Sequence, residues 1–547
     1  MDRADPSLPL AFSYTETVLD LFSNRVRLAP SSVALRDDLG VWTYQEVADL
    51  SDSIGQRLAE TGIDKNSIVA IYASRSSSLV PALLGVWKAG AAFVILDSSY
   101  PAARTLDYAT SVGVDALIVL EAAGELPAEF ELLLNNKGFK LRADLPVSYE
   151  DAAAKFPPGQ RNQDRQLLDA DDTAYVLFTS GTTAKPKAIA TPHSALPHFL
   201  RWYAKTFNPG PEDRFSMLSG LSHDPLMRDI FVPLSVGATL CIPNPDLLKL
   251  PRRLLQWMGS TQITLTHLTP SLARLLIRLA QAGVQPLPSL RYALTGGEPL
   301  RFPDVLGFRK VAPGASLVNC YGASETPQIM AYTINAPSSE IGERGIVPFD
   351  SVVDDVQMLI LRGDRTLAGF NETGEICVRT KYLSKGYLNS PNLTAERFIA
   401  NPFASSGDSL DRIYRTGDLG KLVPDVGIEY VGRADNQVKI RGFRVELEEI
   451  ETVLRSSPLV SDAAVLCDAN PDDPLLYAFV QVSLGFDLDE CKRLLASSLP
   501  NYMIPRDIFE VSALPHNPNG KVDRQQLLSL IERLVMRPTS NAKPPAR

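Results

Sequence analysis

The sequence predicts a multi-domain α/β protein, and three observations lead to this prediction. First, near-continuous apolar runs at 68–72 and 92–96 flank a helical pattern over 78–89. Strands that are apolar on both faces and separated by helices are typical of a parallel sheet covered on both sides. Second, beyond about residue 340 the strands become shorter and are separated by turn residues. Third, 547 residues with 45% hydrophobic content exceed the size of a single domain.

Helices and strands alternate through the first half of the chain. A helix is expected over 15–28, and a second begins near residue 42, where Thr43 and Glu46 stand in the register of a capping box. Further buried strands are expected at 116–120, 175–178, 239–242 and 292–295. These elements predict a large N-terminal lobe over residues 1–434, whose part from about 340 to 434 is a small β-rich subdomain.

The last quarter of the chain predicts a small α+β lobe over 435–530. Helical periodicity is found at 446–456 and 490–499, and apolar strands are expected at 463–465 and 477–482. Residues 531–547 end in a segment rich in Pro, Ser, Asn and Ala. Such a composition cannot form a packed core, so a flexible tail is expected.

Composition excludes several classes of function. The net charge of −9 leaves no broad basic surface, which argues against a nucleic-acid partner. Five scattered cysteines without C-x-x-C spacing predict reduced thiols, with no disulfide framework or zinc site. No apolar run approaches the ~20 residues of a membrane span, and the first residues lack the pattern of a signal peptide. A cytoplasmic protein without membrane partners is therefore expected.

A hydroxyl-rich loop follows the strand expected at 175–178. It consists of Thr179, Ser180, Gly181, Thr182, Thr183, Ala184 and Lys185. Four hydroxyls, a row of backbone N–H groups and a lysine suit a polyphosphate. The G-x-x-x-x-G-K-[ST] spacing of a Walker loop is absent, so a helix-capping P-loop is not predicted. A solvated Ser/Thr turn is the alternative interpretation.

Five further stretches combine charged or polar residues with turns, at 294–298, 319–326, 414–418, 433–444 and 517–521. Tyr321 is suited to stack on a nucleobase. Glu325 is suited to hold Mg²⁺ against phosphates, because this hard cation prefers carboxylate and phosphate oxygens. Asp418 follows a tight turn and is suited to accept hydrogen bonds from ribose hydroxyls. Each stretch alone also fits a plainer structure, such as a strand-end turn or a solvated loop tip.

Together and in this order, the motifs closely resemble the adenylation domains of nonribosomal peptide synthetases, which share a superfamily with acyl-CoA synthetases and luciferases. The resemblance covers roughly residues 15 to 530. It rests on F-T-S-G-T-T at 178–183, N-x-Y-G-x-x-E-T at 319–326, Y-R-T-G-D at 414–418, G-R-x-D-x-Q-V-K-I-R-G-x-R at 432–444 and N-x-N-G-K-V-D-R at 517–524. Ala184 stands where the family usually has Gly, which narrows the backbone options of the loop.

The resemblance implies an enzyme that uses Mg·ATP in two steps. A substrate carboxylate attacks the α-phosphorus, and the phosphopantetheine thiol of a carrier protein, in trans or from a longer synthetase, then takes the acyl group. Lys521, Glu325 and Lys185 are the implied catalytic residues, Glu325 also being the metal ligand, and Asp435 is the implied hinge of the small lobe. The implied nucleotide-binding residues are Thr179, Ser180, Gly181, Thr182, Thr183, Gly297, Glu298, Asn319, Tyr321, Gly322, Ser324, Asp418, Arg433 and Lys439.

The same motif alignment implies a substrate pocket. Its positions are Asp224, Pro225, Arg228, His267, Leu294, Gly296, Cys320, Gln328 and Ile329, with Lys521 last. The family's aspartate, matched by Asp224, pairs with the substrate ammonium. A pocket for an apolar side chain would not bury a guanidinium beside an imidazole, because an unpaired charge in a closed site is expensive. Arg228 and His267 therefore indicate a receptor for a second carboxylate.

The combination of Asp224, Pro225, Arg228 and His267 resembles fungal α-aminoadipate reductase and synthetase modules that activate glutamate through its γ-carboxyl. The run T-H-L-T-P-S at 266–271 also resembles the reductase. The predicted substrate is thus an acidic amino acid, of the glutamate, methylaspartate or α-aminoadipate type, activated at its side-chain carboxylate. The residues that depart from the reductase pattern are Leu294, Cys320, Gln328 and Ile329.

Four alternatives stay open at the level of sequence. Arg228 could pair with Glu298 or Asp229 and never meet substrate. The substrate could be a neutral α- or β-amino acid with a single carboxylate. The acceptor could be coenzyme A, as in an acyl-CoA synthetase. A non-catalytic binding module that kept the ATP fold is disfavoured by the intact lysines and carboxylates of the motifs.

Overall fold

The computed structural model describes residues 3–136, 138–157, 168–180, 186–334, 345–404, 407–468, 470, 474–516 and 522–535. The chain divides into two compact units. One unit is formed by residues 1–179 and 187–435, and the other by 180–186 and 436–547. Both units combine sheets with helices, which confirms the predicted α/β class.

A seven-stranded sheet in the first unit has the order β18-β8-β7-β4-β3-β5-β6. Its strands are β3 (Ile68–Ala73), β4 (Ala92–Asp97), β5 (Ala116–Leu120), β6 (Leu141–Leu145), β7 (Thr173–Thr179), β8 (Lys187–Pro192) and β18 (Gly386–Tyr387). The five strands from β6 to β7 run parallel, as the apolar runs predicted. Because β8 is antiparallel to β7, the hydroxyl-rich loop joins two strands and not a strand to a helix.

A nine-stranded sheet has the order β15-β14-β13-β12-β11-β9-β10-β1-β2. Its strands are β1 (Val33–Asp37), β2 (Gly40–Thr43), β9 (Arg214–Ser216), β10 (Thr239–Cys241), β11 (Leu265–Leu268), β12 (Tyr292–Thr295), β13 (Ser316–Ala323), β14 (Thr326–Ile334) and β15 (Ser351–Val352). The middle strands are parallel, whereas both edges are antiparallel. An antiparallel edge needs only a short connection, so β13 turns directly into β14.

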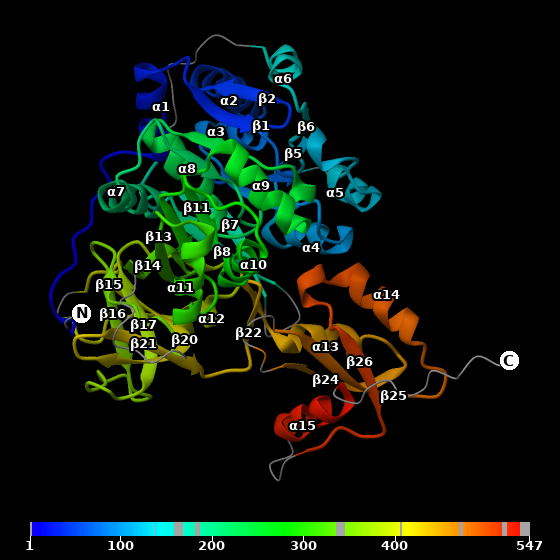
Figure 1. The fold of residues 1–547 in the computed structure, drawn as a ribbon. Coiled ribbons are helices and arrows are strands. Elements are labelled where there is room, and N and C mark those ends of the chain that lie inside the picture. Colours follow the sequence, from blue (N-terminus) through cyan, green and yellow to red (C-terminus); the bar gives the residue numbers. More distant parts are fainter. Residues whose placement is uncertain are drawn as a thin grey trace. The chain divides into compact units, whose positions relative to one another are not determined.

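The helices of the first unit alternate with these strands (Figure 1). They are α1 (Val18–Leu28), α2 (Tyr44–Glu60), α3 (Leu79–Lys88), α4 (Ala102–Val112), α5 (Glu131–Leu134), α6 (Tyr149–Lys155), α7 (Ala195–Phe207), α8 (Pro225–Val236), α9 (Pro251–Thr261), α10 (Pro270–Gln281) and α11 (Phe302–Val311). The capping box predicted at Thr43 and Glu46 is confirmed at the start of α2, where the Thr43 N–H donates to Glu46 Oε2 at 2.6 Å.

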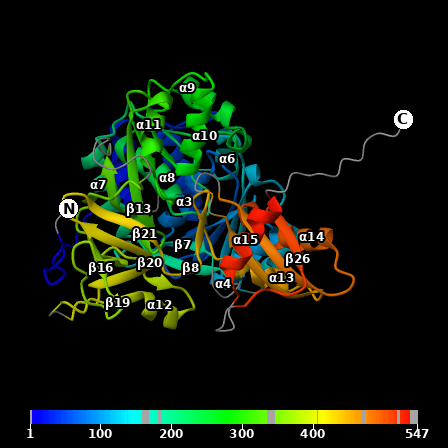
Figure 2. The same ribbon diagram turned by 60° about the horizontal axis from the view of Figure 1, so that its bottom comes forward.

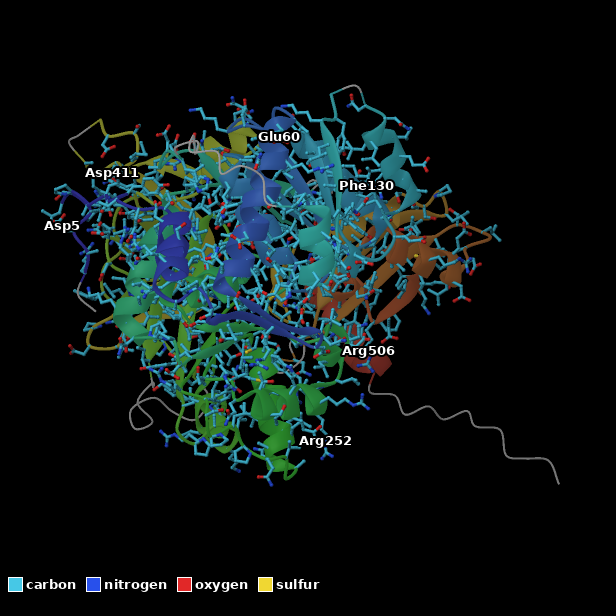
Figure 3. All side chains as sticks on the ribbon, turned by 90° about the horizontal axis from the view of Figure 1, so that it is seen from above. Asp5, Glu60, Phe130, Arg252, Asp411 and Arg506 are labelled. Carbon is cyan, nitrogen blue, oxygen red and sulfur yellow. The ribbon has the colours of Figure 1, made fainter. Side chains whose placement is uncertain are left out.

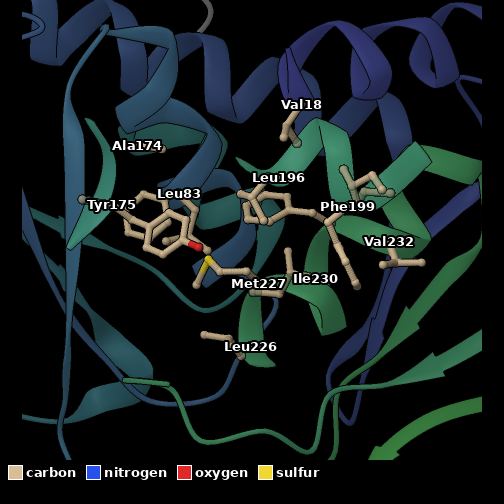
Figure 4. Close-up of a cluster of buried hydrophobic side chains, with 14 of the residues drawn as sticks. Val18, Leu83, Ala174, Tyr175, Leu196, Phe199, Leu226, Met227, Ile230 and Val232 are labelled. Atoms are coloured by element: carbon tan, nitrogen blue, oxygen red, sulfur yellow. The ribbon is translucent and has the colours of Figure 1, made fainter. Parts of the chain in front are cut away.

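One hydrophobic core joins helices and strands of both large sheets, and α8 lies within it. Leu226, Met227 and Ile230 of α8 belong to this core together with Tyr175 of β7 and Phe199 of α7 (Figure 4). Close-packed interiors resist displacement, so this packing fixes the helix on which Arg228 lies.

A five-stranded antiparallel sheet forms the β-rich part of the first unit. It contains β16 (Gln357–Leu361), β17 (Gly374–Thr380), β19 (Phe398–Ala400), β20 (Arg412–Val423) and β21 (Gly427–Arg433). The helix α12 (Pro391–Arg397) directly precedes β19 in the chain. Buried Arg379 pairs with Asp411 at 2.7 Å and also donates to the Leu8 carbonyl at 2.9 Å. The N-terminal segment therefore lies on this sheet, and Asp5 and Asp411 are found on the same side of the molecule (Figure 3).

The second unit is a small α+β structure with its own core. Its strands are β22 (Val438–Ile440), β23 (Phe443–Val445), β24 (Val460–Cys467), β25 (Leu476–Val482) and β26 (Asp507–Val511), and its helices are α13 (Leu447–Arg455), α14 (Leu488–Ser498) and α15 (Arg524–Val535). The three helices flank the sheet of β24, β25 and β26 (Figure 2). The flexible tail was predicted to begin at residue 531, but residues 531–535 complete α15, and Ile531 is buried in the core of this unit. The rest of the tail, residues 536–547, lies outside the described residues.

Candidate active site

Arg228 is a buried cation on α8. Pro225 occupies the first position of this helix, and Gly237 ends it in the left-handed conformation. Arg228 is only 7% exposed, and its buried Nε has no acceptor among the described residues. Among the described residues no hydrogen bond or ion pair reaches its guanidinium. An uncompensated buried charge is strongly destabilising, so an anionic ligand is the natural partner for this group.

The carboxylate next to Arg228 in the sequence is fully engaged elsewhere. Asp229 Oδ1 accepts a hydrogen bond from His267 Nδ1 at 2.6 Å. Asp229 Oδ2 accepts from the backbone N–H groups of Leu218 at 3.0 Å and Ser219 at 2.9 Å. These contacts contradict the alternative in which Asp229 neutralises Arg228.

Glu298, the other carboxylate considered as a partner for Arg228, belongs to a different cluster. Its Oε2 accepts from Ser271 Oγ at 2.6 Å and from Arg274 Nη2 at 3.1 Å. The pairing of Arg228 with Glu298 is therefore also contradicted. The role of Glu298 toward a nucleotide stays a prediction.

His267 is held as a neutral ring. It lies on β11 and is 2% exposed, and its burial lowers the pKa of the imidazole. Because a carboxylate only accepts, Nδ1 carries the proton that Asp229 receives, and Nε2 accepts from the Tyr203 hydroxyl at 3.3 Å. Both ring nitrogens are thus occupied. Among the described residues predicted to line the pocket, Arg228 is therefore the one that supplies positive charge, and His267 has no free N–H for a substrate carboxylate.

Asp224, the residue immediately before α8, is predicted to lie at the other end of the pocket. Its Oδ2 accepts from the Gln328 backbone N–H at 2.8 Å. Its Oδ1 accepts from Gln328 Nε2 at 3.1 Å and from the Tyr175 hydroxyl at 3.3 Å. Burial raises the pKa of Asp224 to about 6 despite these donors. A cation beside this carboxylate would favour its ionised form.

The walls between these ends come from neighbouring strands. In the register of the sheet His267 stands opposite Leu294, and Thr295 stands opposite Asn319, so Cys320 follows on the next strand. A Cβ on Gly296 would lie 3.2 Å from the Cys320 carbonyl oxygen, which leaves little room for a side chain there. Leu294, Cys320 and Ile329 are buried, and burial raises the pKa of the Cys320 thiol to about 12, so this wall is uncharged.

Tyr321 and Asp418, both predicted nucleotide ligands, are brought together from different sheets. The Tyr321 hydroxyl donates to Asp418 Oδ2 at 2.7 Å. Arg433 Nη1 donates to Asp418 Oδ1 at 2.8 Å, while its Nε and Nη2 form a two-point ion pair with Asp435 at 2.6 and 2.8 Å. The predicted hinge residue is therefore linked through Arg433 to the predicted ribose ligand.

The turn between β13 and β14 carries the remaining predicted ligands of this motif. Glu325 is fully buried and accepts from the Tyr387 hydroxyl at 2.7 Å. Asn319 Nδ2 donates to the Val347 carbonyl at 2.9 Å. A Cβ on Gly322 would lie 2.1 Å from the Gln328 carbonyl oxygen, so only glycine fits there. Ser324 lies beside Glu325 at the turn.

Several features fit a Mg·ATP substrate. Thr179, the last residue of β7, has a buried hydroxyl with no partner among the described residues, which suits a phosphate oxygen. Glu325 offers the carboxylate that a hard divalent ion takes together with phosphates. Gly297 adopts a φ of +86°, which allows the backbone to approach a ligand closely.

Other predicted residues cannot be placed against this site. Ser180 and Lys439 belong to the second compact unit. The loop residues Gly181, Thr182, Thr183 and Lys185, and the catalytic candidate Lys521, lie outside the described residues.

Four residues around the pocket were not predicted as site residues. Tyr175 and Tyr203 donate to Asp224 and to His267, and Asp229 fixes His267. Arg75 donates to the carbonyls of Met217 and Ser219 at 2.6 and 2.7 Å, beside the backbone that Asp229 holds. These residues are far apart in the sequence and no motif assigned them a role in the pocket, so only the tertiary contacts identify that role.

The chain belongs to the family of AMP-binding enzymes, and it is an adenylate-forming enzyme. Residues 22–388 match the AMP-binding enzyme domain, and residues 449–521 match the AMP-binding enzyme C-terminal domain. No helix in the described part of the chain is both long and apolar enough to cross a membrane.

Its relatives are larger proteins. The chain is 32% identical to L-2-aminoadipate reductase of Schizosaccharomyces pombe, over 96% of this chain and 42% of the reductase. It is also 32% identical to a linear gramicidin synthase protein of Brevibacillus parabrevis, over 94% of this chain and 6% of that protein. A solved structure of holo-PA1221, an NRPS protein containing adenylation and PCP domains, superposes with a TM-score of 0.78 at 26% identity, over 94% of this chain and 84% of the other.

Proposed function

We propose that this enzyme adenylates an acidic amino acid of the glutamate, methylaspartate or α-aminoadipate type at its side-chain carboxylate. The observation that carries the proposal is the buried guanidinium of Arg228, which has no partner among the described residues. Asp224 provides the complementary negative charge for an ammonium group. An α-ammonium at Asp224 and an α-carboxylate at Arg228 leave the distal carboxylate free to reach ATP.

The first half-reaction joins this distal carboxylate to AMP. A carboxylate oxygen attacks the α-phosphorus, the bond to the β-phosphate oxygen breaks, and pyrophosphate leaves. Lys521 and Lys185 compensate the charge that gathers in the transition state, and the loop from Thr179 to Thr183 holds the leaving phosphates. Bound Mg²⁺, held by Glu325, would neutralise charge on the phosphate oxygens.

The nucleotide itself is held by residues of the turn and of β20. Tyr321 and Asn319 bind the adenine, Asp418 binds the ribose hydroxyls, and Ser324 faces the α-phosphate. Asp418 is fixed for this role by Tyr321 and Arg433, which take one oxygen each and leave further lone pairs for the ribose.

In the second half-reaction the thiol of a phosphopantetheine arm attacks the acyl carbon, and AMP leaves as the thioester forms. The presence of PCP domains in the similar solved structure supports a carrier protein as acceptor. The name of the reductase relatives supports α-aminoadipate among the substrates to be tried. Rotation of the small lobe about Asp435 separates the two half-reactions.

ATP–pyrophosphate exchange tests the substrate class. Glutamate, aspartate, methylaspartate and α-aminoadipate are compared with leucine, alanine, phenylalanine and β-alanine. Exchange confined to the acidic amino acids is expected. Exchange confined to the neutral ones would leave the adenylating chemistry intact and overturn the proposed substrate.

Arg228→Leu tests the residue that carries the proposal. Loss of a buried charge-assisted contact is expected to lower kcat/KM for the dicarboxylate by roughly 30-fold or more, because such contacts are worth ~2–5 kcal/mol. The matched control is Arg252→Leu on the exposed face of α9, which should leave exchange unchanged. Equal kcat/KM for the Arg228 variant and the native enzyme would refute the role of Arg228.

The acceptor is tested separately from the substrate. Preformed acyl-adenylate is offered either a phosphopantetheinylated carrier protein or coenzyme A. Thioester on the carrier alone supports the proposal, whereas transfer to coenzyme A alone would make the enzyme an acyl-CoA synthetase.

A further inference from the structure

Gln328 has an unusual backbone conformation for a residue inside a strand. It lies on β14, is 2% exposed, and adopts a φ of +74°. A residue with a Cβ is disfavoured in this left-handed region by about 1–2 kcal/mol. Such a conformation persists only where surrounding contacts hold it, and these places are often ligand sites.

Asp224 provides the contacts that hold Gln328. The Gln328 backbone N–H donates to Asp224 Oδ2 at 2.8 Å, and its Nε2 donates to Asp224 Oδ1 at 3.1 Å and to the Asp224 carbonyl at 3.2 Å. An ionised carboxylate only accepts hydrogen bonds, so the amide must turn its nitrogen toward Asp224. The amide oxygen, Oε1, therefore points away from Asp224. Oε1 is buried and accepts no hydrogen bond from any residue in the part of the chain that the structure describes.

The hydrogen-bonding capacity of Asp224 is nearly exhausted without a ligand. Its two oxygens offer about four lone-pair sites. Gln328 N–H occupies one site on Oδ2, while Gln328 Nε2 and the Tyr175 hydroxyl occupy both sites on Oδ1. One site on Oδ2 is left. A primary ammonium brings three N–H donors, so Asp224 alone cannot satisfy it in a buried pocket.

We infer that Gln328 is a second, direct ligand of the substrate ammonium and determines the preference for amino acids over the same acids without an amino group. Oε1 of Gln328 accepts one ammonium N–H, and the open site on Asp224 Oδ2 accepts another. The Gln328 N–H groups meanwhile keep Asp224 in place. This inference rests on the proposed function only in requiring an amino acid substrate, and it does not depend on the second carboxylate.

Two substitutions separate the acceptor role from the donor role of Gln328. Gln328→Met has nearly the same shape and removes both the acceptor and the donor. Gln328→Glu keeps acceptor oxygens in the same place but removes the N–H groups that face Asp224. The best amino acid found for the native enzyme and its analogue lacking the amino group, for example glutamate and glutarate, are compared in pyrophosphate exchange.

Gln328→Met is expected to raise the KM of the amino acid by roughly 10-fold or more, while kcat/KM for the analogue changes less than about 2-fold. Gln328→Glu is expected to keep most of the preference for the amino acid. An equal loss of preference in both variants would mean that only the donor role matters and would overturn the inference. So would an unchanged preference in Gln328→Met, or equal losses for both substrates.

The experiment also distinguishes this inference from the proposed function. If the native enzyme exchanges only with neutral amino acids, the acidic substrate class is wrong, yet the two variants can still be tested with the neutral amino acid and its analogue. If acidic amino acids are active and Gln328→Met keeps their preference, the proposed function stands and the inference fails.

Discussion

Replacing Asp224 by Asn should make the folded protein more stable while it abolishes activity. The pKa of Asp224 is raised from 3.8 to about 6 by burial, so ionising this carboxyl destabilises the folded state. One pKa unit corresponds to 1.36 kcal/mol, and a rise of about 2 units therefore corresponds to roughly 3 kcal/mol. Asparagine resembles the neutral acid. A turn of the Gln328 amide lets its Oε1 accept from the new NH₂ group, at the cost of the hydrogen bond from Nε2 to the backbone carbonyl of residue 224.

The sign of the pH dependence follows from the raised pKa. The contribution of Asp224 to the free energy of unfolding is greatest below its unfolded pKa of 3.8. It decreases as the pH rises from 3.8 to about 6, the folded pKa, and is constant above that. The Asn variant does not lose stability in this way, because asparagine does not ionise. It should exceed the native protein by roughly 3 kcal/mol at pH 8 and by about half of that at pH 5. In the native enzyme kcat/KM for the amino acid should fall as the pH drops below about 6, because the protonated carboxyl no longer attracts an ammonium.

Urea unfolding followed by tryptophan fluorescence measures this difference. Trp42, Trp87, Trp202 and Trp257 are the four tryptophans of the sequence, and all lie in the first compact unit, so the signal reports the unit that contains Asp224. A variant that is less stable than the native protein at pH 8, or a difference that does not change between pH 5 and 8, would refute the reasoning.

Asp229→Asn is the matched control for this experiment. The two carboxylates are five residues apart and both are buried, but Asp229 accepts from His267 and from two backbone N–H groups. An amide would direct its NH₂ group at one of these donors. The control should therefore lose roughly 1–3 kcal/mol of stability where Asp224→Asn gains it.

Three further variants test the rest of the site. Gly322→Ala should lower the free energy of unfolding by at least ~1–3 kcal/mol in a urea titration, because the new Cβ would lie 2.1 Å from a backbone oxygen of β14. Gly363→Ala is the control: a Cβ there meets nothing within 4 Å, so this variant should unfold like the native protein. Tyr321→Phe removes one donor to Asp418 and should raise the KM of ATP roughly 2- to 10-fold without changing that of the amino acid; an unchanged KM of ATP would contradict this role. Lys521→Ala should lower adenylation by roughly 100-fold or more and thiolation of preformed adenylate far less, and similar losses in both would exclude its assigned role.

The sequence predicted the elements of the first unit closely because each carries a local signal. The strands β3, β4 and β5 are buried nearly throughout, and their residues form unbroken apolar runs. The capping box of α2 depends on two side chains three residues apart. The antiparallel edges of both large sheets were not predicted, because strand direction depends on how distant segments pair and an apolar run is the same in either direction.

The same distinction between local signals and long-range contacts applies to the candidate site. The sequence by itself determined the α/β class and the motifs of an adenylate-forming enzyme, because these depend on residue types at fixed spacing. The pocket positions Asp224 and Arg228 are predictions that rest on the resemblance those motifs carry. Only the tertiary structure decided that His267 is neutral, that Arg228 has no partner among the described residues, and that Gln328 holds Asp224. Those properties depend on hydrogen bonds between residues 38 to 104 positions apart in the chain, which no local pattern records.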